Sequence, residues 1–509
     1  MFVLHAERAA FVKPVNSMCK LAVCAVLLSV AAQGAVIRGV VVEKQTGYLL
    51  SHAVVTLQSL SAQGQSDHSV RTSESGQFEF GNLALGAYLL TASRRGFLPA
   101  QYGQKRWNSA GTPIVIDHDA VTQLRFSLLR YGAITGIVRD SNEAGIPDQG
   151  VAAYAATQPP QLMVRAKSDD RGVYRLGGLT PGTYLVRTTG DIDDDIAYVP
   201  TFSRQTFRVE EARLVTVYPD EDTNDGDIRP IAGRLFEISG SATPGPGFVG
   251  TTVTLASETG RIIIQGETFR FEALPPGRYE IYAEAHDSSG TRFVGGYTEI
   301  PFLSRDLKFA MPMNPMPAVT LRLEGAGPTA ATNGLVRRID LAGPGPVKPL
   351  KLGAATTIPL LQGRWEFLVG APDGYYISQF AGSRNNIRGD AWNEVQVRNS
   401  TGVTVTLAKG GGTLYGTVKA GNAAVFAAPV SLQAWDFTAR KPVGELRQIR
   451  TDANGGYRFD NLAPGMYRIL ATFDYATPDA AAFDFAQAQS IQIEANTNKQ
   501  LDLAFWNQQ

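Results

Sequence analysis

Apolar and polar residues alternate along most of the chain in short runs. In Phe78-Glu79-Phe80 and in residues 124–128, every second residue is apolar. Successive side chains of a β-strand point to opposite faces of the sheet, so this alternation is typical of strands with one buried face. No long segment shows the 3.6-residue apolar period of an amphipathic helix. The pattern therefore predicts an all-β chain.

One alternating segment recurs with fixed spacing. In four copies an aromatic residue is followed five residues later by Leu, eight later by Gly and ten later by Tyr. These copies start at Phe78, Tyr174, Phe269 and Tyr457 and end at Tyr88, Tyr184, Tyr279 and Tyr467, and a degraded fifth copy keeps Leu360, Gly363 and Trp365. A tyrosine just after a tight turn can bury its ring and hydrogen-bond nearby backbone. We expect the four tyrosines to be core residues and not ligand contacts.

Each copy belongs to a larger unit. An opening strand with a central glycine precedes it (residues 37–41 in the first unit), and an alternating strand closes the unit. The closing strand of one unit runs almost directly into the opening strand of the next, which leaves no flexible linker. We predict five tandem Greek-key β-sandwiches of about 80–105 residues, end to end in an elongated rod. Their predicted bounds are 35–130, 131–235, 236–315, a divergent unit 316–410, and 411–509.

The N-terminus has the features of a secretory signal peptide over residues 1–34. Lys13 and Lys20 precede an uncharged apolar run at 21–32, and Ala32 and Gly34 supply small residues for cleavage. The run is shorter than the roughly 20 residues that span a membrane. Translation from Met1 or from Met18 fits this interpretation equally well. We expect an exported protein of the periplasm, cell surface or extracellular space, with no membrane span in its mature chain.

Composition narrows the function further. Lys and Arg together number 47, as do Asp and Glu, so the formal net charge is zero, which argues against a nucleic-acid-binding protein. The two cysteines, Cys19 and Cys24, both lie in the predicted signal peptide, so the mature chain has no disulfide or thiol chemistry. Val23 occupies the position where a lipoprotein motif has a small residue, which disfavours a lipid anchor at Cys24.

The repeated motif resembles the carboxypeptidase regulatory-like domain, a small Greek-key sandwich of the transthyretin-like or starch-binding-like kind. The resemblance covers units one, two and five well. Unit three lacks the Asp-x-x-Gly turn, and unit four keeps only the three motif residues named above. Tandem copies behind a signal peptide resemble large secreted bacterial proteins. The resemblance implies a non-catalytic module and permits carbohydrate binding.

Catalytic motifs are not evident in the sequence. The five histidines are His5, His52, His68, His118 and His286, and none has Glu three residues later, as zinc peptidases require. The chain contains neither a Gly-x-Ser-x-Gly elbow nor a phosphate-binding Gly-x-x-x-x-Gly-Lys-Ser/Thr loop. We therefore predict a protein that is not an enzyme and has no cofactor.

An acidic segment at 191–227 carries eleven Asp and Glu against three Arg. Within it, a candidate calcium loop consists of Asp220, Asp222, Asn224, Asp225 and Asp227, because Ca²⁺ takes six to eight oxygen ligands. Gly226 falls one place late for a helix-loop-helix site, and no Glu closes the loop. A solvated acidic loop is the alternative interpretation.

Aromatic residues in predicted loops are candidates for stacking against sugars. They are Tyr102, Trp107, Tyr375, Tyr376, Trp392 and Trp435. The alternative is that they belong to the cores. The leading functional hypothesis is an exported, non-enzymatic protein for extracellular binding, adhesion or scaffolding. Two alternatives are a carbohydrate-binding protein and an accessory or regulatory subunit of a secreted hydrolase. The partner would be a polysaccharide or another extracellular protein.

Overall fold

The computed structural model describes residues 34–60, 67–118, 121–157, 159–189, 191–193, 196–325, 332–384, 391–438 and 440–508. The predicted signal peptide lies outside these residues except for Gly34, as do both cysteines. The described chain consists of strands β1 to β44, a short 3₁₀ helix (Val209–Glu211) and helix α1 (Ala480–Phe485), which confirms the all-β class. No helix in these ranges combines the length and apolarity needed to cross a membrane.

Unit one shows the plan that the other units repeat. Two sheets face each other, and the first and last long strands, β1 and β8, are parallel neighbours in the first sheet. The first sheet is β4 (Gln77–Leu83), β1 (Ala35–Glu43), β8 (Val121–Leu128). The second is β3 (His68–Arg71), β2 (Val54–Ser59), β5 (Gly86–Ser93), β6 (Ala100–Gln101), with β7 (Ile114–Ile116) also on β5.

Units two and three keep this plan. The first sheet of unit two is β12 (Val173–Leu179), β9 (Gly132–Ile137), β17 (Asp222–Asn224), and its second is β11 (Gln161–Lys167), β10 (Gly150–Ala155), β13 (Gly182–Thr188), β16 (Leu214–Val217). A small extra sheet is β14 (Asp191–Asp193), β15 (Ile196–Val199), β18 (Ile231–Ala232). The first sheet of unit three is β22 (Thr268–Leu274), β19 (Phe236–Ser241), β25 (Leu307–Ala310), and its second is β21 (Gly260–Gln265), β20 (Phe248–Ser257), β23 (Gly277–Asp287), β24 (Phe293–Leu303), β26 (Asn314–Pro315).

Units four and five complete the series. The strand order in the first sheet of unit four is β31 (Ala355–Pro359), β27 (Ala318–Glu324), β35 (Thr401–Lys409), β33 (Tyr375–Ala381). In its second sheet, β28 (Thr332–Asp340) pairs with β29 (Gly343–Pro344), β30 (Lys348–Leu352) and β32 (Gly363–Val369). Strand β32 also pairs with β34 (Asn393–Val397). In unit five, β36 (Gly412–Ala420) pairs with β37 (Ala423–Ala424), β40 (Gly456–Leu462), β43 (Asn498–Gln500) and β44 (Leu503–Ala504), and the second sheet is β39 (Lys441–Arg450), β38 (Pro429–Asp436), β41 (Gly465–Ala471), β42 (Gln489–Ile493).

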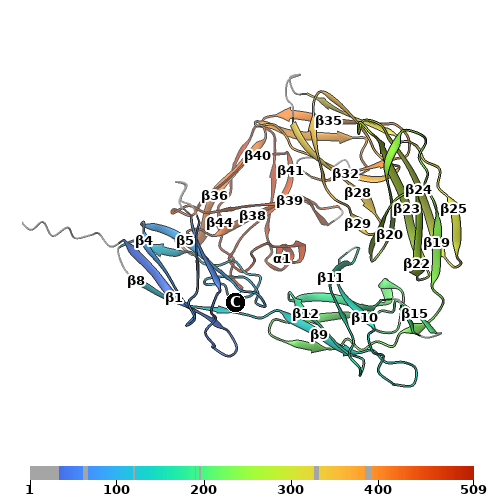
Figure 1. The fold of residues 1–509 in the computed structure, drawn as a ribbon. Helices are drawn as coiled ribbons and strands as arrows, with labels where there is room; N and C mark the ends of the chain where they lie inside the picture. Colours follow the sequence, from blue (N-terminus) through green and yellow to red (C-terminus); the bar gives the residue numbers. More distant parts are fainter. Residues whose placement is uncertain are drawn as a thin grey trace, which may run out of the picture.

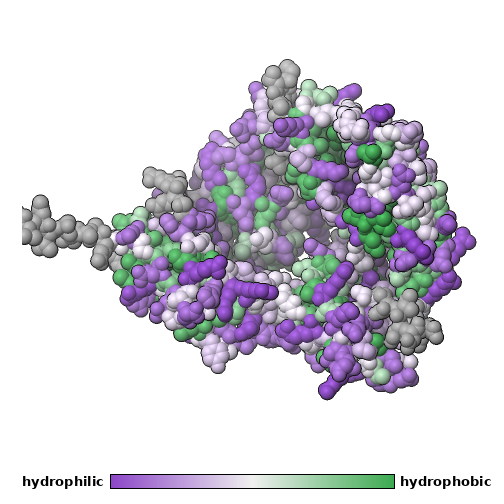
Figure 2. All heavy atoms as spheres, viewed as in Figure 1, coloured by the Kyte–Doolittle hydropathy of each residue, from purple (hydrophilic) through white to green (hydrophobic). Residues whose placement is uncertain are grey.

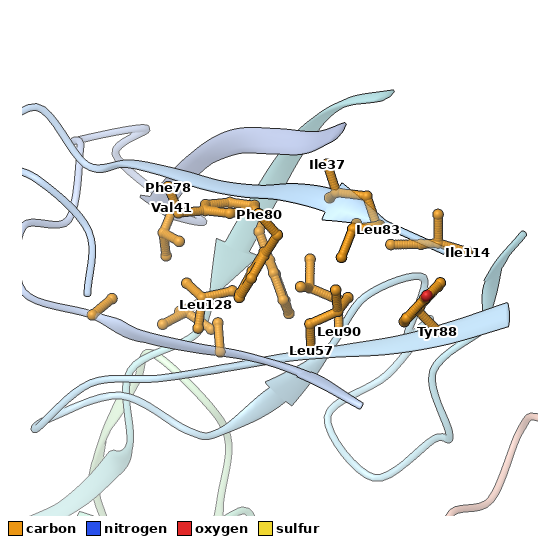
Figure 3. Close-up of a cluster of buried hydrophobic side chains, with 14 of the residues drawn as sticks. Ile37, Val41, Leu57, Phe78, Phe80, Leu83, Tyr88, Leu90, Ile114 and Leu128 are labelled. Carbon is orange, nitrogen blue, oxygen red and sulfur yellow. The ribbon is translucent and has the colours of Figure 1, made fainter. Parts of the chain in front are cut away.

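The core of each unit lies between its two sheets. In unit one, Ile37 and Phe80 from the first sheet meet Leu57 and Leu90 from the second, and all four are at most 5% exposed (Figure 3). These are the apolar positions of the alternating pattern. Because each strand contributes every second residue, burial of this face accounts for the pattern read from the sequence.

The central glycine of the opening strand is a packing requirement. A Cβ on Gly39 would lie 2.2 Å from the carbonyl oxygen of Leu124 on β8. It would also lie 3.0 Å from the ring of Phe78, the residue of β4 that pairs with Gly39. Unit four has no such glycine: Leu321 of its opening strand pairs with Thr356, and Ala355 stands five residues before Leu360, where the other copies have an aromatic residue.

The four motif tyrosines are core residues, as predicted. Each is at most 7% exposed, and each hydroxyl donates to the carbonyl oxygen four residues upstream at 2.7 to 2.9 Å. In unit four, Trp365 makes the equivalent bond, because its Nε1 donates to the carbonyl oxygen of Leu361 at 2.8 Å. All five units therefore close the same turn with a buried aromatic donor.

The five units do not form an elongated rod. Figure 1 shows the chain running round a ring in which unit one lies against unit five. The backbone N–H of Ala110 donates to Phe473 and that of Ala476 donates to Asn108, both at 2.8 Å. Arg106 lies 3.5 Å from Asp474, which is 2% exposed. The rod prediction was wrong because a short linker fixes the angle between two units without making that angle straight.

Further contacts stabilise the ring. At the junction of units one and two, the guanidinium of Arg130 forms an ion pair with Glu43. The backbone N–H of Arg130 donates to the carboxylate of Asp220 at 2.7 Å. Between units three and four, Arg261 forms an ion pair with the buried Asp340 at 2.7 Å. Units two and four also touch, since a Cβ on Gly343 would lie 2.7 Å from Cγ of Pro159. Figure 2 shows a hollow in the middle of the ring.

The tyrosine bond predicts a graded loss of stability in unit one. Tyr88→Phe removes only the hydroxyl bond and should lower the local free energy of unfolding by about 1 kcal/mol. Tyr88→Ala also removes the buried ring and should cost about 3–5 kcal/mol. Hydrogen exchange of β4 and β5 measures both effects. Tyr48→Phe is the control, because Tyr48 is 72% exposed. Equal losses for Tyr88→Phe and Tyr48→Phe would contradict the role of the bond.

Ring closure can be tested by cross-linking. In a chain whose two native cysteines are replaced by serine, Asn108→Cys and Ala476→Cys place thiols on residues joined by a backbone hydrogen bond. A short bis-maleimide reagent should link them within one molecule, giving a faster band on a denaturing gel. Each single-cysteine variant is a control and should show no such band. An elongated rod would separate these residues by several units, so the absence of the internal cross-link would refute the ring.

Candidate functional site

A groove on unit one brings together two of the predicted sugar-stacking residues. The loop 98–112 folds beside β8 and borders a groove of about 560 Å³ that includes Tyr102 and Trp107. This volume lies within the usual range for small-ligand sites, roughly 300–1,000 Å³. Of the predicted aromatic candidates, only these two line this groove. It is therefore the site that best matches the sequence prediction.

Internal hydrogen bonds hold the loop in place. The N–H of Thr112 donates to Tyr102 at 3.0 Å, and the side-chain amide of Gln104 donates to the carbonyl oxygen of Trp107 at 2.6 Å. Gly103 has φ +76°, and a Cβ there would lie 1.9 Å from Oγ1 of Thr112. Glycine fits this position because it has no Cβ and accepts a positive φ, and the hydrogen bonds on either side of it hold the groove wall.

The two aromatic side chains differ in exposure. Trp107 is 39% exposed, so part of its side chain is open to solvent. Tyr102 is partly buried and packs edge-to-face on Phe126, with ring centroids 6.0 Å apart. Trp107 is thus the available stacking surface, while Tyr102 joins the groove to the core of unit one.

The charges lining the groove have one sign. Lys44, Lys105, Arg106 and Arg125 line it, and no Asp or Glu does so among the described residues. Lys105 and Arg106 also reach Asp474 of unit five, at 3.9 and 3.5 Å. Lys44 and Arg125 are exposed. An aromatic face beside cationic side chains suits an anionic ligand with a flat, weakly polar face.

The other predicted aromatic residues are dispersed. Tyr375 packs against the core of unit four and lies under Lys409, Tyr376 is half-buried beside it, and the ring of Trp392 lies 3.9 Å from the guanidinium of Arg337. Trp435 is a correction to the loop-platform prediction, because it lies in β38 and is 8% exposed. Its ring is covered by Arg468, 4.7 Å away, and by Phe483 of α1. A helix that the strand pattern did not predict thus buries it.

One aromatic pair was missed from the sequence. Tyr475 and Trp506 stack with ring centroids 5.8 Å apart, and Arg106 of unit one lies 5.9 Å from the Tyr475 ring. This pair belongs to the contact that closes the ring. Nothing in the local pattern joins these residues, which meet only through the tertiary fold.

The candidate calcium residues lie along β17 and its flanks, and the four aspartates among them have partners within the protein. Asp222 forms a bidentate pair with Arg175 at 2.8 and 2.9 Å, which holds the pKa of Asp222 below its usual range. Asp225 pairs with Arg213, and Asp227 accepts from the N–H of Ile137 at 2.9 Å. No group of three or more metal-ligating side chains is placed to hold an ion within the described ranges. Calcium binding stays an untested prediction.

The histidines of unit one are not gathered into a site. His52, His68 and His118 are all exposed, and His52 lies 3.3 Å from Glu74. His118 interacts with its neighbour Asp117. These positions match the strand-end and loop placement expected for histidines without a shared role.

Comparison with known families and sequences identifies part of the chain. The model of the carboxypeptidase regulatory-like domain matches residues 36–128. Colossin-A of Dictyostelium discoideum is 24% identical over 261 residues, which covers 45% of this chain and 2% of that protein. The chain thus corresponds to a small part of that relative's length.

Among solved structures, the minor pilin GBS52 of Streptococcus agalactiae aligns with 40% of this chain and 97% of its own, at 13% identity and a TM-score of 0.25. The shaft pilin SpaA of Lactobacillus rhamnosus GG aligns with 39% and 97%, at 10% identity and a TM-score of 0.24. These scores are too low to carry an inference about function. Residues 36–128, which match the model of the carboxypeptidase regulatory-like domain, coincide with the first of the five β-sandwich units in this chain.

Proposed function

We propose that this protein is a non-enzymatic binding scaffold of the cell exterior, and that the groove on unit one binds an acidic glycan. The observation that carries the proposal is the groove itself: Trp107 presents an exposed ring between Lys44, Arg125 and the loop that contacts unit five. The apolar face of an acidic sugar can stack on the tryptophan ring. Its carboxylate is attracted by the cationic side chains.

The scaffold part of the proposal rests on the ring. Successive units are joined without flexible linkers, and buried ion pairs such as Arg261–Asp340 fix their relative placement. The contact between units one and five removes the free ends that a string of domains would have. Such a ring holds its surfaces at fixed separations, which is what a scaffold requires. Export depends on the signal peptide predicted over residues 1–34.

A role as accessory subunit of a secreted hydrolase is the second candidate, and only the resemblance to regulatory-like domains favours it. A scaffold could also bind another extracellular protein, but no feature of the groove favours a protein partner. The acidic glycan is preferred because the groove combines an aromatic face with cations and has no carboxylate in its described lining.

The prediction is that the full chain binds polygalacturonate more tightly than the methyl-esterified polymer, whose carboxylates are blocked. Trp107→Ala should weaken binding about tenfold, a loss typical of an aromatic at the centre of a binding site. Replacing Lys44 and Arg125 together by Gln should weaken binding and reduce its dependence on salt. Affinity electrophoresis or calorimetry measures each dissociation constant.

Tyr48→Ala is the matched control, since Tyr48 is an exposed aromatic residue of the same unit that does not line the groove. It should leave binding unchanged. Equal affinity for the two polymers, or full binding by Trp107→Ala, would rule out the groove as an acidic-glycan site. Hydrolysis of the polymer with ordinary turnover would rule out the non-enzymatic scaffold.

A further inference from the structure

A second cavity lies between units two and three, away from the groove on unit one. Its volume is about 540 Å³. One wall is the outer face of the second sheet of unit two, and the other is formed by the β20–β21 and β22–β23 turns of unit three. Both units are needed to form it, so it exists only because the ring fixes their relative position.

Two arginines stand side by side on the wall from unit two. Arg165 on β11 and Arg187 on β13 both pair with Ala152, which lies between them on β10. Neighbouring strands are about 4.8 Å apart, so the two arginine backbones are separated by about 10 Å. Ala152 itself is buried under Phe202, and both arginines line the cavity beside it. Tyr154, two residues further along β10, continues the same face.

Arg187 has an unusual environment for a cation. Its guanidinium lies 5.9 Å from the Tyr154 ring and 5.5 Å from the Phe202 ring, and its one hydrogen bond is a long one of 3.4 Å to Thr188. Burial lowers its pKa. Within the described part of the chain, neither Arg187 nor Arg165 forms an ion pair with a carboxylate.

The other arginines of the cavity are paired, which sets these two apart. Arg261 pairs with Asp340 at 2.7 Å, Arg208 with Glu211 at 3.4 Å, and Arg278 with Glu299 at 3.8 Å. Arg187 is partly buried without an ion pair, which is costly, whereas Arg165 beside it is exposed. The planar fork of a guanidinium matches a carboxylate, so the two arginines together have the chemistry of an anion-binding site.

The rim of the cavity indicates what the rest of the ligand is. Phe207 from unit two is 45% exposed and Phe302 from unit three is 60% exposed, and both line the cavity. An apolar body placed between them would cover both rings. Glu210 and Glu258 also border the cavity, and these carboxylates oppose a ligand with several negative charges.

We propose that this cavity binds a small monocarboxylate with an apolar or aromatic body, held at its carboxylate by Arg187 and Arg165. The carboxylate accepts from both guanidinium groups, which line the cavity. The body extends toward Phe207 and Phe302. A single negative charge is attracted by the two arginines and is repelled less by Glu210 and Glu258 than a multiply charged ligand would be.

Calorimetric titration of the full chain tests this assignment with benzoate as the probe, benzamide as its uncharged counterpart and inorganic phosphate as the alternative anion. Benzoate should bind to one site, and benzamide should bind at least about tenfold more weakly, because it lacks the charge-assisted bonds. Arg187→Gln and Arg165→Gln should each weaken benzoate binding by a similar factor. Arg171→Gln, which alters an exposed arginine of unit two outside the cavity, is the control and should have no effect.

Glu258→Gln separates a local effect from a folding defect. It removes a negative charge from the unit-three side of the cavity and should tighten benzoate binding severalfold, a gain that a misfolded variant cannot give. A dissociation constant of about 20 mM marks the weakest site worth detecting. Absence of benzoate binding at this concentration would therefore overturn the proposal. Unchanged affinity in Arg187→Gln would do so as well. Phosphate binding as tight as benzoate binding, and lost in the same variants, would overturn the monocarboxylate assignment.

Discussion

The parallel pairing of the first and last strands of every unit determines how the whole chain is built. In unit one, β1 and β8 run side by side in the same direction, and the same holds for β9 and β17, β19 and β25, β27 and β35, and β36 and β43. The chain therefore enters a unit at one end of this sheet and leaves it at the other. Each unit must begin where the previous one ends, and in units one, two, three and five the glycine of the opening strand lets the closing segment approach.

The junctions convert this linear order into a ring. Residues 129–131 join units one and two, and 410–411 join units four and five, so rotation between neighbours is restricted. Specific polar contacts then select one angle at a junction, as Glu43 and Asp220 do around Arg130. Buried ion pairs add little net stability compared with apolar packing, but losing one partner leaves an unpaired buried charge. Their main contribution here is therefore to geometry.

The ring also explains why the two binding surfaces lie where they do. The loop 98–112 has one side in the groove of unit one, and through Arg106 and Asn108 it contacts unit five. The cavity between units two and three is formed by surfaces that neither unit could enclose alone. The groove of unit one, by contrast, is lined by residues of that unit alone, and the contact with unit five holds the loop that borders it.

Much of each unit follows from the sequence by itself, because its signals are local. The two-residue period identified the strands, and the fixed offset from Phe78 to Tyr88 identified the turn and its buried tyrosine, since both reflect backbone geometry over a few residues. The tertiary structure alone decided the rest. Asp222 pairs with Arg175 from β12, on the far side of β9 in the same sheet, and Trp435 is covered by α1, so both environments come from residues distant in sequence. The ring depends on contacts between residues such as Asn108 and Ala476, which are separated by most of the chain. Local periodicity specifies which face of a strand is buried, but it does not specify the angle between two packed units.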